Sequence, residues 1–236
     1  MGWKSIVREF APPIVMKVLR PPRRSGGFIS ATETIAAAKA AGLSVSDYVN
    51  RDQPRSGTAL LDKLCELKLI GPEIKSVVEI GAGTGSCLEA LLKRCRPTLY
   101  QVYEIDAKWS AWLAKTYPIE ACPADGRSLK STSSRSCDFI HSHGLFVYLP
   151  FLVSYCYFKE IARVAAPGCV VTFNVFSEEC LDAETAEKWL ASGYEHACLL
   201  SSAYVKNFFE ANGFRFVNSF ILPFGPGKSE YLVFRR

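Results

Sequence analysis

The fold of this chain is decided by residues 77–88, VVEIGAGTGSCL. The first four residues are mostly apolar and predict a short buried strand, and the leucine spacing from residue 88 onward predicts a helix. Glycines stand between them at positions 81, 83 and 85. Glycine is required where the backbone takes a positive φ or where a ligand approaches the main chain closely. Because a helix N-terminus also presents free N–H groups and a positive dipole end, the stretch predicts a nucleotide-type cradle at the carboxyl end of a strand.

The spacing of these glycines distinguishes between two cofactors. The dinucleotide fingerprint G-x-G-x-x-G would require a glycine where Ser86 stands. The run EIGAGTG at residues 79–85 instead resembles motif I of the class I S-adenosylmethionine (SAM) methyltransferases. The resemblance implies that Glu79 lies near the amino end of the methionine part of SAM. It also implies that the ribose and the methionine are backed by Gly81, Ala82, Gly83 and Gly85. The alternative is a glycine-rich turn without a ligand.

Strand-like and helix-like patterns alternate from residue 75 onward, which argues for a parallel sheet. Strands are expected at residues 77–80, 98–103, 119–121, 137–144, 169–175, 214–222 and 230–235. The resemblance covers about residues 70–236 and implies the Rossmann-like α/β fold of the class I methyltransferases, a seven-stranded, mostly parallel sheet with an antiparallel last strand. We divide the chain into a basic amphipathic arm with its linker (1–27), an N-terminal helical extension (28–70) and a SAM-binding domain (71–236).

Two acidic residues follow later strands at positions where this cofactor is expected. Glu104 ends the second strand, 19 residues after Gly85, and a carboxylate there can accept hydrogen bonds from both ribose hydroxyls. Asp106 competes for this role, but we interpret it as the cap of the next helix. The turn ADGRSL at residues 124–129 resembles motif III of the same family, which implies that Asp125 accepts from the adenine amine. The alternative for Asp125 is a simple Asp-Gly turn. The expected cofactor site also includes Ile105 and Gly126.

The fourth strand, expected at residues 137–144, carries the chemistry. It lacks the (Asn/Asp)-Pro-Pro-(Tyr/Phe) run of the family's amide and base N-methyltransferases and the Pro-Cys nucleophile of its C5-cytosine enzymes. It holds two of the three histidines, and histidine titrates near neutrality, which suits removal of a proton from an attacking hydroxyl. His141 and His143 share a strand face. We expect His143 to be the general base and His141 to orient it. The alternative is one core histidine and one that does not titrate.

Three residues are candidates for contact with the methyl acceptor. Tyr48 belongs to the N-terminal helices, which commonly lie over the site in SAM methyltransferases, although a helix-packing role is the alternative. Tyr148 stands near the start of a helix expected at residues 147–163. Asn174 stands near the end of the fifth strand, where ligands bind in open α/β sheets.

A weaker likeness concerns the class of acceptor. Residues 42–48, GLSVSDY, together with Ser142-His143-Gly144, look like bacterial sugar O-methyltransferases that act on glycans or their precursors. The resemblance implies a sugar hydroxyl as acceptor and, in several such enzymes, a divalent ion such as Mg²⁺. The metal stays open, because no Asp, Glu or His cluster shows clear ligand spacing. The alternatives are a small-metabolite or lipid-linked acceptor, or a non-catalytic SAM-binding or partner-binding subunit.

Composition bounds the location of the protein. The 236 residues are 49% hydrophobic, which is ample for a core, but no apolar run is long enough to span a membrane. Nine cysteines occur without a C-x-x-C pair, which predicts buried free thiols in a reducing compartment. The first apolar stretch is broken by Pro12 and Pro13, unlike a signal peptide. We therefore expect a cytoplasmic protein.

The net charge of +5 resides entirely in residues 1–24, where six Lys and Arg residues stand against Glu9. Apolar residues alternate with these charges, as in segments that lie on anionic membrane surfaces. We expect either a peripheral contact with the inner face of the membrane or packing of this arm on the domain or on a second subunit. Oligomeric state stays open. Basic charge confined to one arm does not favour nucleic acid as a partner.

Overall fold

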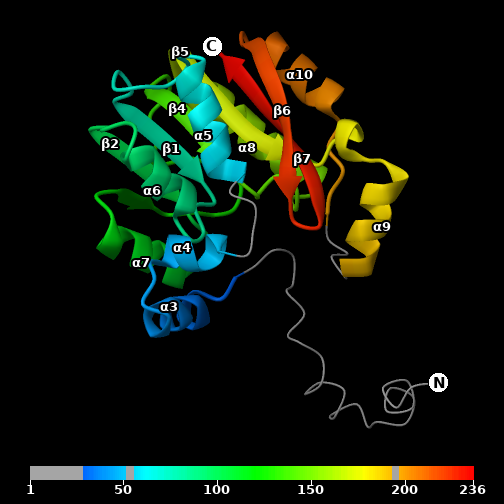
Figure 1. Ribbon diagram of the computed structural model, residues 1–236. Helices are drawn as coiled ribbons and strands as arrows, with labels where there is room; N and C mark the ends of the chain where they lie inside the picture. The colour runs from blue at the N-terminus through cyan, green and yellow to red at the C-terminus, as the bar shows by residue number, and fades with distance from the viewer. Residues whose placement is uncertain (1–28, 52–55, 193–196) are drawn as a thin grey trace, which may run out of the picture.

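The computed structural model describes residues 29–51, 56–192 and 197–236, so the predicted basic arm and linker (1–27) lie outside the described residues. The described chain forms a seven-stranded sheet with helices on both faces (Figure 1). The strands are β1 (Ser76–Ile80), β2 (Leu99–Tyr103), β3 (Glu120–Cys122), β4 (Cys137–Ser142), β5 (Ala165–Val175), β6 (Arg215–Phe224) and β7 (Gly227–Arg235). Their order is β3-β2-β1-β4-β5-β7-β6, and β7 runs antiparallel to both neighbours. The predicted Rossmann-like methyltransferase sheet is confirmed.

The helices and one 3₁₀ turn connect and cover these strands. They are α3 (Ala31–Ala40), α4 (Val45–Asn50), α5 (Ser56–Glu66), α6 (Ser86–Leu92), α7 (Ala107–Thr116), α8 (Phe151–Val164), η1 (Glu178–Cys180), α9 (Ala183–Ser192) and α10 (Ser202–Ala211). Successive strand residues point to opposite faces. Val77 accordingly packs under α5 and α6, whereas Val78 packs on the side of α8 and α10. The sheet therefore has two separate apolar cores.

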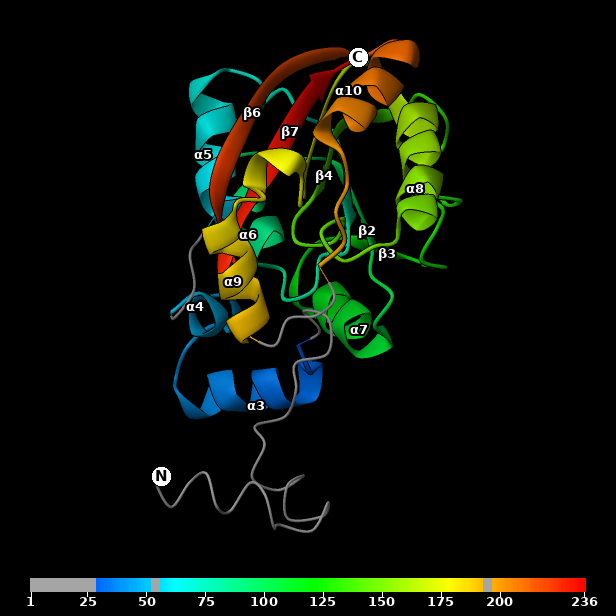
Figure 2. The same cartoon turned by 90° about the vertical axis from the view of Figure 1, so that its right-hand side faces the viewer.

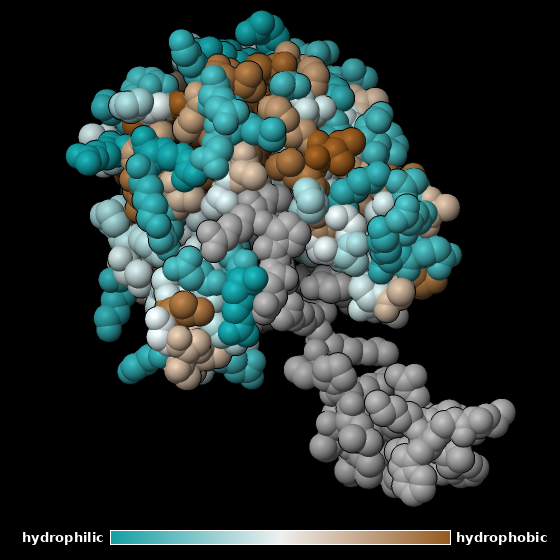
Figure 3. Space-filling view, in the orientation of Figure 1, coloured by the Kyte–Doolittle hydropathy of each residue, from teal (hydrophilic) through white to brown (hydrophobic). Residues whose placement is uncertain are grey.

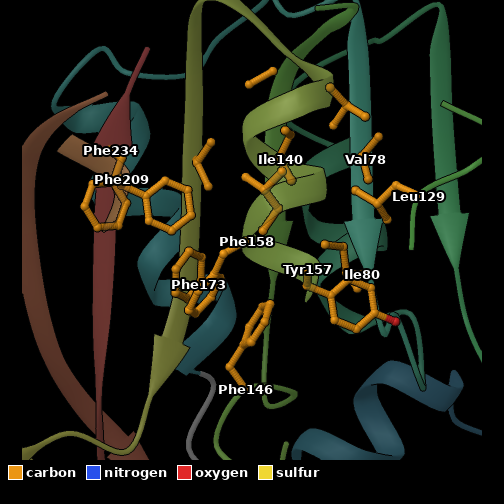
Figure 4. Packing of buried hydrophobic residues seen from close by; sticks show 14 of the residues in the cluster. Val78, Ile80, Leu129, Ile140, Phe146, Tyr157, Phe158, Phe173, Phe209 and Phe234 are labelled. Atoms are coloured by element: carbon orange, nitrogen blue, oxygen red, sulfur yellow. The ribbon is translucent and has the colours of Figure 1, made fainter. Parts of the chain in front are cut away.

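The core beneath α8 and α10 combines aliphatic residues with a group of aromatic side chains that contact one another (Figure 4). Phe158 of α8 lies 5.4 Å from Phe173 of β5, and Phe209 of α10 lies 4.6 Å from Phe234 of β7, between ring centroids. Each of these rings is almost fully buried, which stabilises the fold by about 2–3 kcal/mol per side chain. This packing fixes α8 and α10 against the sheet and leaves the carboxyl ends of the strands to build a site.

The helices α3 and α4 pack beyond the carboxyl ends of β1 and β2 (Figures 1 and 2). The side chains of Ser30 and Ser44 accept hydrogen bonds from the backbone as N-caps of α3 and α4. Buried apolar residues of both helices contact Trp109 in the first turn of α7. The extension is therefore fastened to the element that follows β2.

Several element boundaries differ from expectation, among them the start of β5, which begins at Ala165 rather than at residue 169. The strand β4 ends at Ser142, so His143 lies just beyond it. The helix α8 begins at Phe151, after Pro150, because the residue before a proline is disfavoured in the helical region. Tyr148 therefore lies in the loop before α8, not in its first turn. The final hairpin turns within two residues, 225–226, rather than six.

No helix among the described residues is long and apolar enough to cross a membrane. The face seen in Figure 3 is mostly polar, with apolar side chains in small separate areas.

Candidate cofactor and acceptor site

The glycine-rich loop after β1 adopts the conformation that only glycine takes readily. Gly81, Gly83 and Gly85 have φ values of +72°, +50° and +73°. A Cβ at Gly85 would lie 2.7 Å from Leu113 of α7, so this glycine is also required for packing. A Cβ at Gly83 would meet nothing within 4 Å. The loop thus leaves open space on the side of Gly83, where a ligand can approach the backbone.

The carboxylate of Glu104 is held against this loop. Its Oε2 accepts from the N–H of Gly83 at 2.7 Å, and its Oε1 accepts from the N–H of Asp106 at 2.8 Å. Asp106 caps α7 by accepting hydrogen bonds from two backbone N–H groups. The prediction that Asp106 is a helix cap is therefore confirmed. Glu104 is left with acceptor capacity beside the loop.

The turns after β2 and β3 meet next to Glu104. The side chain of Ile105 is 71% exposed, and a Cβ at Gly126 would lie 3.3 Å from its Cδ1. Asp125 accepts hydrogen bonds from the hydroxyl of Ser128, from the N–H groups of Arg127 and Ser128 and from Lys130, which hold its carboxyl pKa well below the usual range. Asp125 therefore braces its own turn, and its contact with an adenine amine stays a prediction.

These residues fit an adenosine cofactor by their chemistry. A backbone cradle with open space at Gly83, a carboxylate at Glu104 and an exposed apolar side chain at Ile105 stand together at the carboxyl ends of β1 and β2. Ribose hydroxyls need acceptors, and an adenine ring needs an apolar surface. Asn50 of α4 donates to the hydroxyl of Ser86 at 3.3 Å, which ties the N-terminal helices to this cradle.

Beneath the loop, three polar side chains from three strands form a buried cluster. Tyr100 of β2 donates to Oε2 of Glu79 at 2.7 Å, and its hydroxyl lies 2.9 Å from Nε2 of His141. Burial raises the pKa of Glu79 to about 8 and lowers that of His141 to about 3. Glu79 is only 2% exposed. Its carboxyl group therefore lies under the cradle, bonded to Tyr100, and its place near the amino end of the methionine part stays a prediction.

His143 occupies a different place from His141. It is half-buried beyond the end of β4, and its Nδ1 is in hydrogen-bond contact with the hydroxyl of Tyr231 on β7. His141 instead stacks on Phe139 at 5.0 Å. Burial lowers the pKa of His143 to about 4, so its imidazole is neutral at neutral pH. Both histidines lie on one face of the sheet, as predicted, and this is the face covered by α5 and α6. Each has its own tyrosine partner, so the expectation that His141 orients His143 is corrected.

The structure places two of the predicted acceptor contacts, Asn174 and Tyr48, in different surroundings. Asn174 is fully buried, and its Oδ1 accepts from the N–H of Gly144 at 2.7 Å while its Nδ2 donates to Ser229 at 3.0 Å. Its amide therefore holds the loop after β4, and the direct acceptor contact is corrected. Tyr48 packs with α3 and α4, and the guanidinium of Arg51 lies 4.1 Å from its ring. This arrangement agrees with the helix-packing alternative.

Tyr148 remains near the expected acceptor side. Its ring lies 6.1 Å from that of Phe224 at the tip of the β6–β7 hairpin, and Phe224 lies 5.9 Å from His143. Trp189 of α9 packs on the same phenylalanine at 6.5 Å. The sequence did not identify Phe224, Trp189 or the two tyrosines paired with the histidines. The one sequence signal for these pairings was a tyrosine inside an apolar strand, such as Tyr100, because a buried tyrosine hydroxyl usually requires a polar partner.

Within residues 29–51, 56–192 and 197–236, no group of three or more His, Cys, Asp or Glu side chains could hold a metal ion. The structure thus offers no described ligand set for the divalent ion that the sequence left open.

Known proteins share this fold. A family model described as a methyltransferase domain matches residues 50–219. No match was found among curated protein sequences. The structure of magnesium protoporphyrin IX methyltransferase from Synechocystis PCC 6803, with bound S-adenosylhomocysteine, has a TM-score of 0.57 at 16% identity and covers 99% of each chain.

Two further structures are similar. The N-methyltransferase NodS from Bradyrhizobium japonicum, in complex with S-adenosylhomocysteine, has a TM-score of 0.59 at 14% identity, covering 86% of this chain and 97% of that one. An O-methyltransferase family protein from Burkholderia thailandensis has a TM-score of 0.60 at 15% identity, covering 81% and 59%. At these identities the likeness concerns the fold.

Proposed function

The chain belongs to the methyltransferase-domain family, with S-adenosylmethionine as its cofactor, and we propose that it transfers the methyl group to a hydroxyl with His143 as general base. The observation that carries the proposal is the placement of His143. It follows the carboxyl end of β4, and a Cβ at Gly81 of the cradle would lie 3.3 Å from Leu145, two residues further along. An imidazole therefore stands in the loop that borders the cofactor cradle.

In the proposed reaction, the residues of the cradle bind the cofactor and His143 in the loop after β4 removes the proton. S-adenosylmethionine supplies an electrophilic methyl group when bound. Glu104 accepts from the ribose hydroxyls, and the Gly83 region of the loop lets the backbone approach the ligand. The imidazole of His143 is neutral, so one ring nitrogen can accept the proton that the attacking hydroxyl must lose. Alignment of the two reactants supplies most of the rate.

For the acceptor, we propose a hydroxyl of a sugar or glycan precursor. The support is the likeness of residues 42–48 and 142–144 to sugar O-methyltransferases, together with the aromatic rings of Tyr148 and Phe224 beside His143. Small metabolites and lipid-linked hydroxyls are the second acceptor class. A non-catalytic SAM-binding subunit is the alternative from a different class.

The cofactor site is tested by calorimetric titration of SAM and S-adenosylhomocysteine. We expect micromolar binding to the wild type and at least tenfold weaker binding to Glu104→Ala and Glu104→Gln, which corresponds to about 1.4 kcal/mol. Glu66→Ala, an exposed carboxylate at the end of α5, is the matched control and should bind normally. Equal affinity of all four proteins would remove Glu104 from the cofactor site.

The reaction itself is tested by transfer of a labelled methyl group from SAM to a panel of sugars and other hydroxylated acceptors. We expect His143→Gln to bind SAM normally and to lose at least a hundredfold in kcat. Full turnover by His143→Gln would contradict the general-base role. Normal SAM binding by the wild type without transfer to any hydroxyl in the panel would favour the binding subunit.

A further inference from the structure

We infer that Tyr231 is a positioning residue that fixes the tautomer of His143, an inference that rests on the proposed function. Tyr231 lies on β7, is fully buried, and places its hydroxyl in hydrogen-bond contact with Nδ1 of His143. The two rings are nearly parallel, with an interplanar angle of 4° and a centroid separation of 5.7 Å. The contact that carries the inference is the one between the Tyr231 hydroxyl and Nδ1 of His143.

The sheet and its neighbours hold this pair in place. The register of β5 and β7 sets Tyr231 opposite Asn174, whose Oδ1 holds the N–H of Gly144, the residue after His143. On the other side stands Gly57 of α5. A Cβ there would lie 3.1 Å from the His143 ring and 2.5 Å from the sulfur of Cys87. The imidazole is therefore enclosed between β7 and α5.

The groups around His143 make the tyrosine its decisive polar partner. Burial raises the pKa of Cys87 far above its usual value, so the thiol stays neutral, and His141 is neutral because burial lowers its pKa to about 3. Phe224 packs edge-on at 5.9 Å and offers only its ring. Among the described residues, the hydrogen bond to Tyr231 therefore engages Nδ1 of the neutral imidazole, and its direction sets which ring nitrogen carries the proton.

The direction of this hydrogen bond matters for the chemistry. When Nδ1–H donates to the Tyr231 oxygen, Nε2 keeps a lone pair and can accept a proton. During transfer the acceptor O–H bond breaks and its proton moves to Nε2. The acceptor oxygen bonds to the methyl carbon as the carbon–sulfur bond breaks and sulfur keeps the electron pair. His143 is then an imidazolium whose Nδ1–H still donates to Tyr231. In the opposite tautomer Nε2 already carries the proton and cannot act as base.

The tautomer is measured by ring ¹⁵N NMR on the full chain. The sequence holds only three histidines, so the ring signals that disappear in His143→Gln are those of His143. We expect Nδ1–H to be the major form in the wild type. In Tyr231→Phe, which keeps the ring and removes the hydroxyl, we expect Nδ1–H to be lost as the major form. A wild type with Nε2–H as the major form would overturn the inference, as would an unchanged tautomer in Tyr231→Phe.

A matched control separates this effect from loss of a buried hydroxyl in general. Tyr103 of β2 is also buried, and its hydroxyl lies 2.8 Å from that of Thr132 on the opposite face of the sheet. Tyr103→Phe should leave the His143 tautomer and kcat unchanged. Tyr231→Phe should lower kcat at least tenfold with unchanged SAM affinity. If Tyr103→Phe shifts the tautomer equally, Tyr231 has no special role.

Failure of the inference is distinguishable from failure of the proposed function. If the tautomer depends on Tyr231 but His143→Gln turns over hydroxyl acceptors normally, the general-base proposal fails and the tautomer assignment stands. If His143 is required for turnover while Tyr231→Phe leaves the tautomer and kcat unchanged, the positioning role alone is wrong.

Discussion

At the scale of single residues, Glu79 is the most unusual side chain of the protein. It is 2% exposed and lies in the middle of a strand, where an ionised carboxylate loses most of its hydration. One hydroxyl, from Tyr100, partly compensates at 2.7 Å, and Nε2 of His141 lies 3.8 Å away. Burial dominates over these contacts and raises the pKa to about 8. The folded protein therefore holds a proton here that the unfolded chain releases.

This proton makes stability depend on pH in a direction that can be tested. The pKa of Glu79 rises from 4.5 unfolded to about 8 folded, so the free energy of unfolding falls as pH increases between these values. Relative to Glu79→Gln, which cannot ionise, we expect the wild type to lose roughly 2 kcal/mol between about pH 6 and about pH 8. Urea denaturation at a series of pH values measures this difference.

The comparison cancels other titrations. The pKa of both buried histidines is lowered by burial, so they add stability as pH rises toward 6.5, but they do so in both proteins. Glu66→Gln, an exposed carboxyl, should give a flat difference from the wild type. A flat curve for Glu79→Gln as well would mean that Glu79 ionises like a solvated acid.

Residues differ in how far the sequence could predict them. Asp106 was predictable because a cap acts on its own helix, within three residues. The burial of Glu79 under Tyr100 and the use of Asn174 to hold Gly144 were not. These contacts join strands that are distant in the chain, and they depend on which residues face each other across the sheet. The pairing of His143 with Tyr231 spans 88 residues for the same reason.

At the scale of elements, a glycine can be required by the backbone conformation of its loop or by the approach of a ligand, and two glycines of this protein allow the two requirements to be tested separately. Gly83 and Gly213 both have a positive φ, +50° and +83°, and an added Cβ meets nothing within 4 Å at either position. Either residue changed to alanine should lower the free energy of unfolding by about 1–2 kcal/mol through backbone strain. Only Gly83 lies in the cradle. Gly83→Ala should therefore also weaken SAM binding at least tenfold in a calorimetric titration.

Gly213→Ala is the internal control for this experiment, since it carries similar strain after α10, outside the cradle. If both variants bind SAM with the affinity of the wild type, the ligand does not approach the backbone at Gly83. If both lose affinity equally, the effect comes from stability rather than from contact.

Element boundaries show where local rules suffice. The positions of the strands along the chain were predictable because glycine turns and apolar runs are local signals, whereas the antiparallel last strand was implied by the family resemblance. The start of α8 was misplaced because Pro150 shifts it past an apolar run that continues the helical pattern backward. The hairpin loop was expected to be longer because Pro223 lies in β6, where it pairs with Lys228 of β7. Edge position explains this strand proline.

At the scale of the whole molecule, the carboxyl ends of the strands form one functional end of the sheet. There, α3 and α4 pack on α7 beside the cradle, and α9 packs beside the β6–β7 hairpin (Figure 2). The cofactor residues come from β1, β2 and their turns, and the residues around His143 come from β4, β6 and β7. Under the proposed function, the cofactor and the acceptor would bind at different halves of one sheet, in agreement with the rule for ligand sites in open α/β sheets.

The charge distribution yields a prediction for the whole chain. Residues 1–24 carry all of the net charge of +5, so the remainder is neutral overall. Each basic residue near an anionic surface contributes about 1 kcal/mol of attraction. We propose that this arm directs the enzyme to membranes, and we expect the full chain to sediment with vesicles containing phosphatidylserine. Deletion of residues 1–24 should abolish this binding, as should raised salt, because exposed charges are screened.

If the arm instead packs on the domain or on a second subunit, deletion of residues 1–24 should have different effects. An arm that packs on the domain or on a second subunit contributes buried apolar area, so its deletion should lower the thermal midpoint or change the sedimentation coefficient in the absence of vesicles. An arm that serves the membrane leaves both unchanged, and it leaves SAM affinity unchanged because the cradle is built from residues 79–126. Neutral phosphatidylcholine vesicles are the matched control. Equal sedimentation of the full and shortened chains with anionic vesicles would rule out the membrane role, whatever the other measurements give.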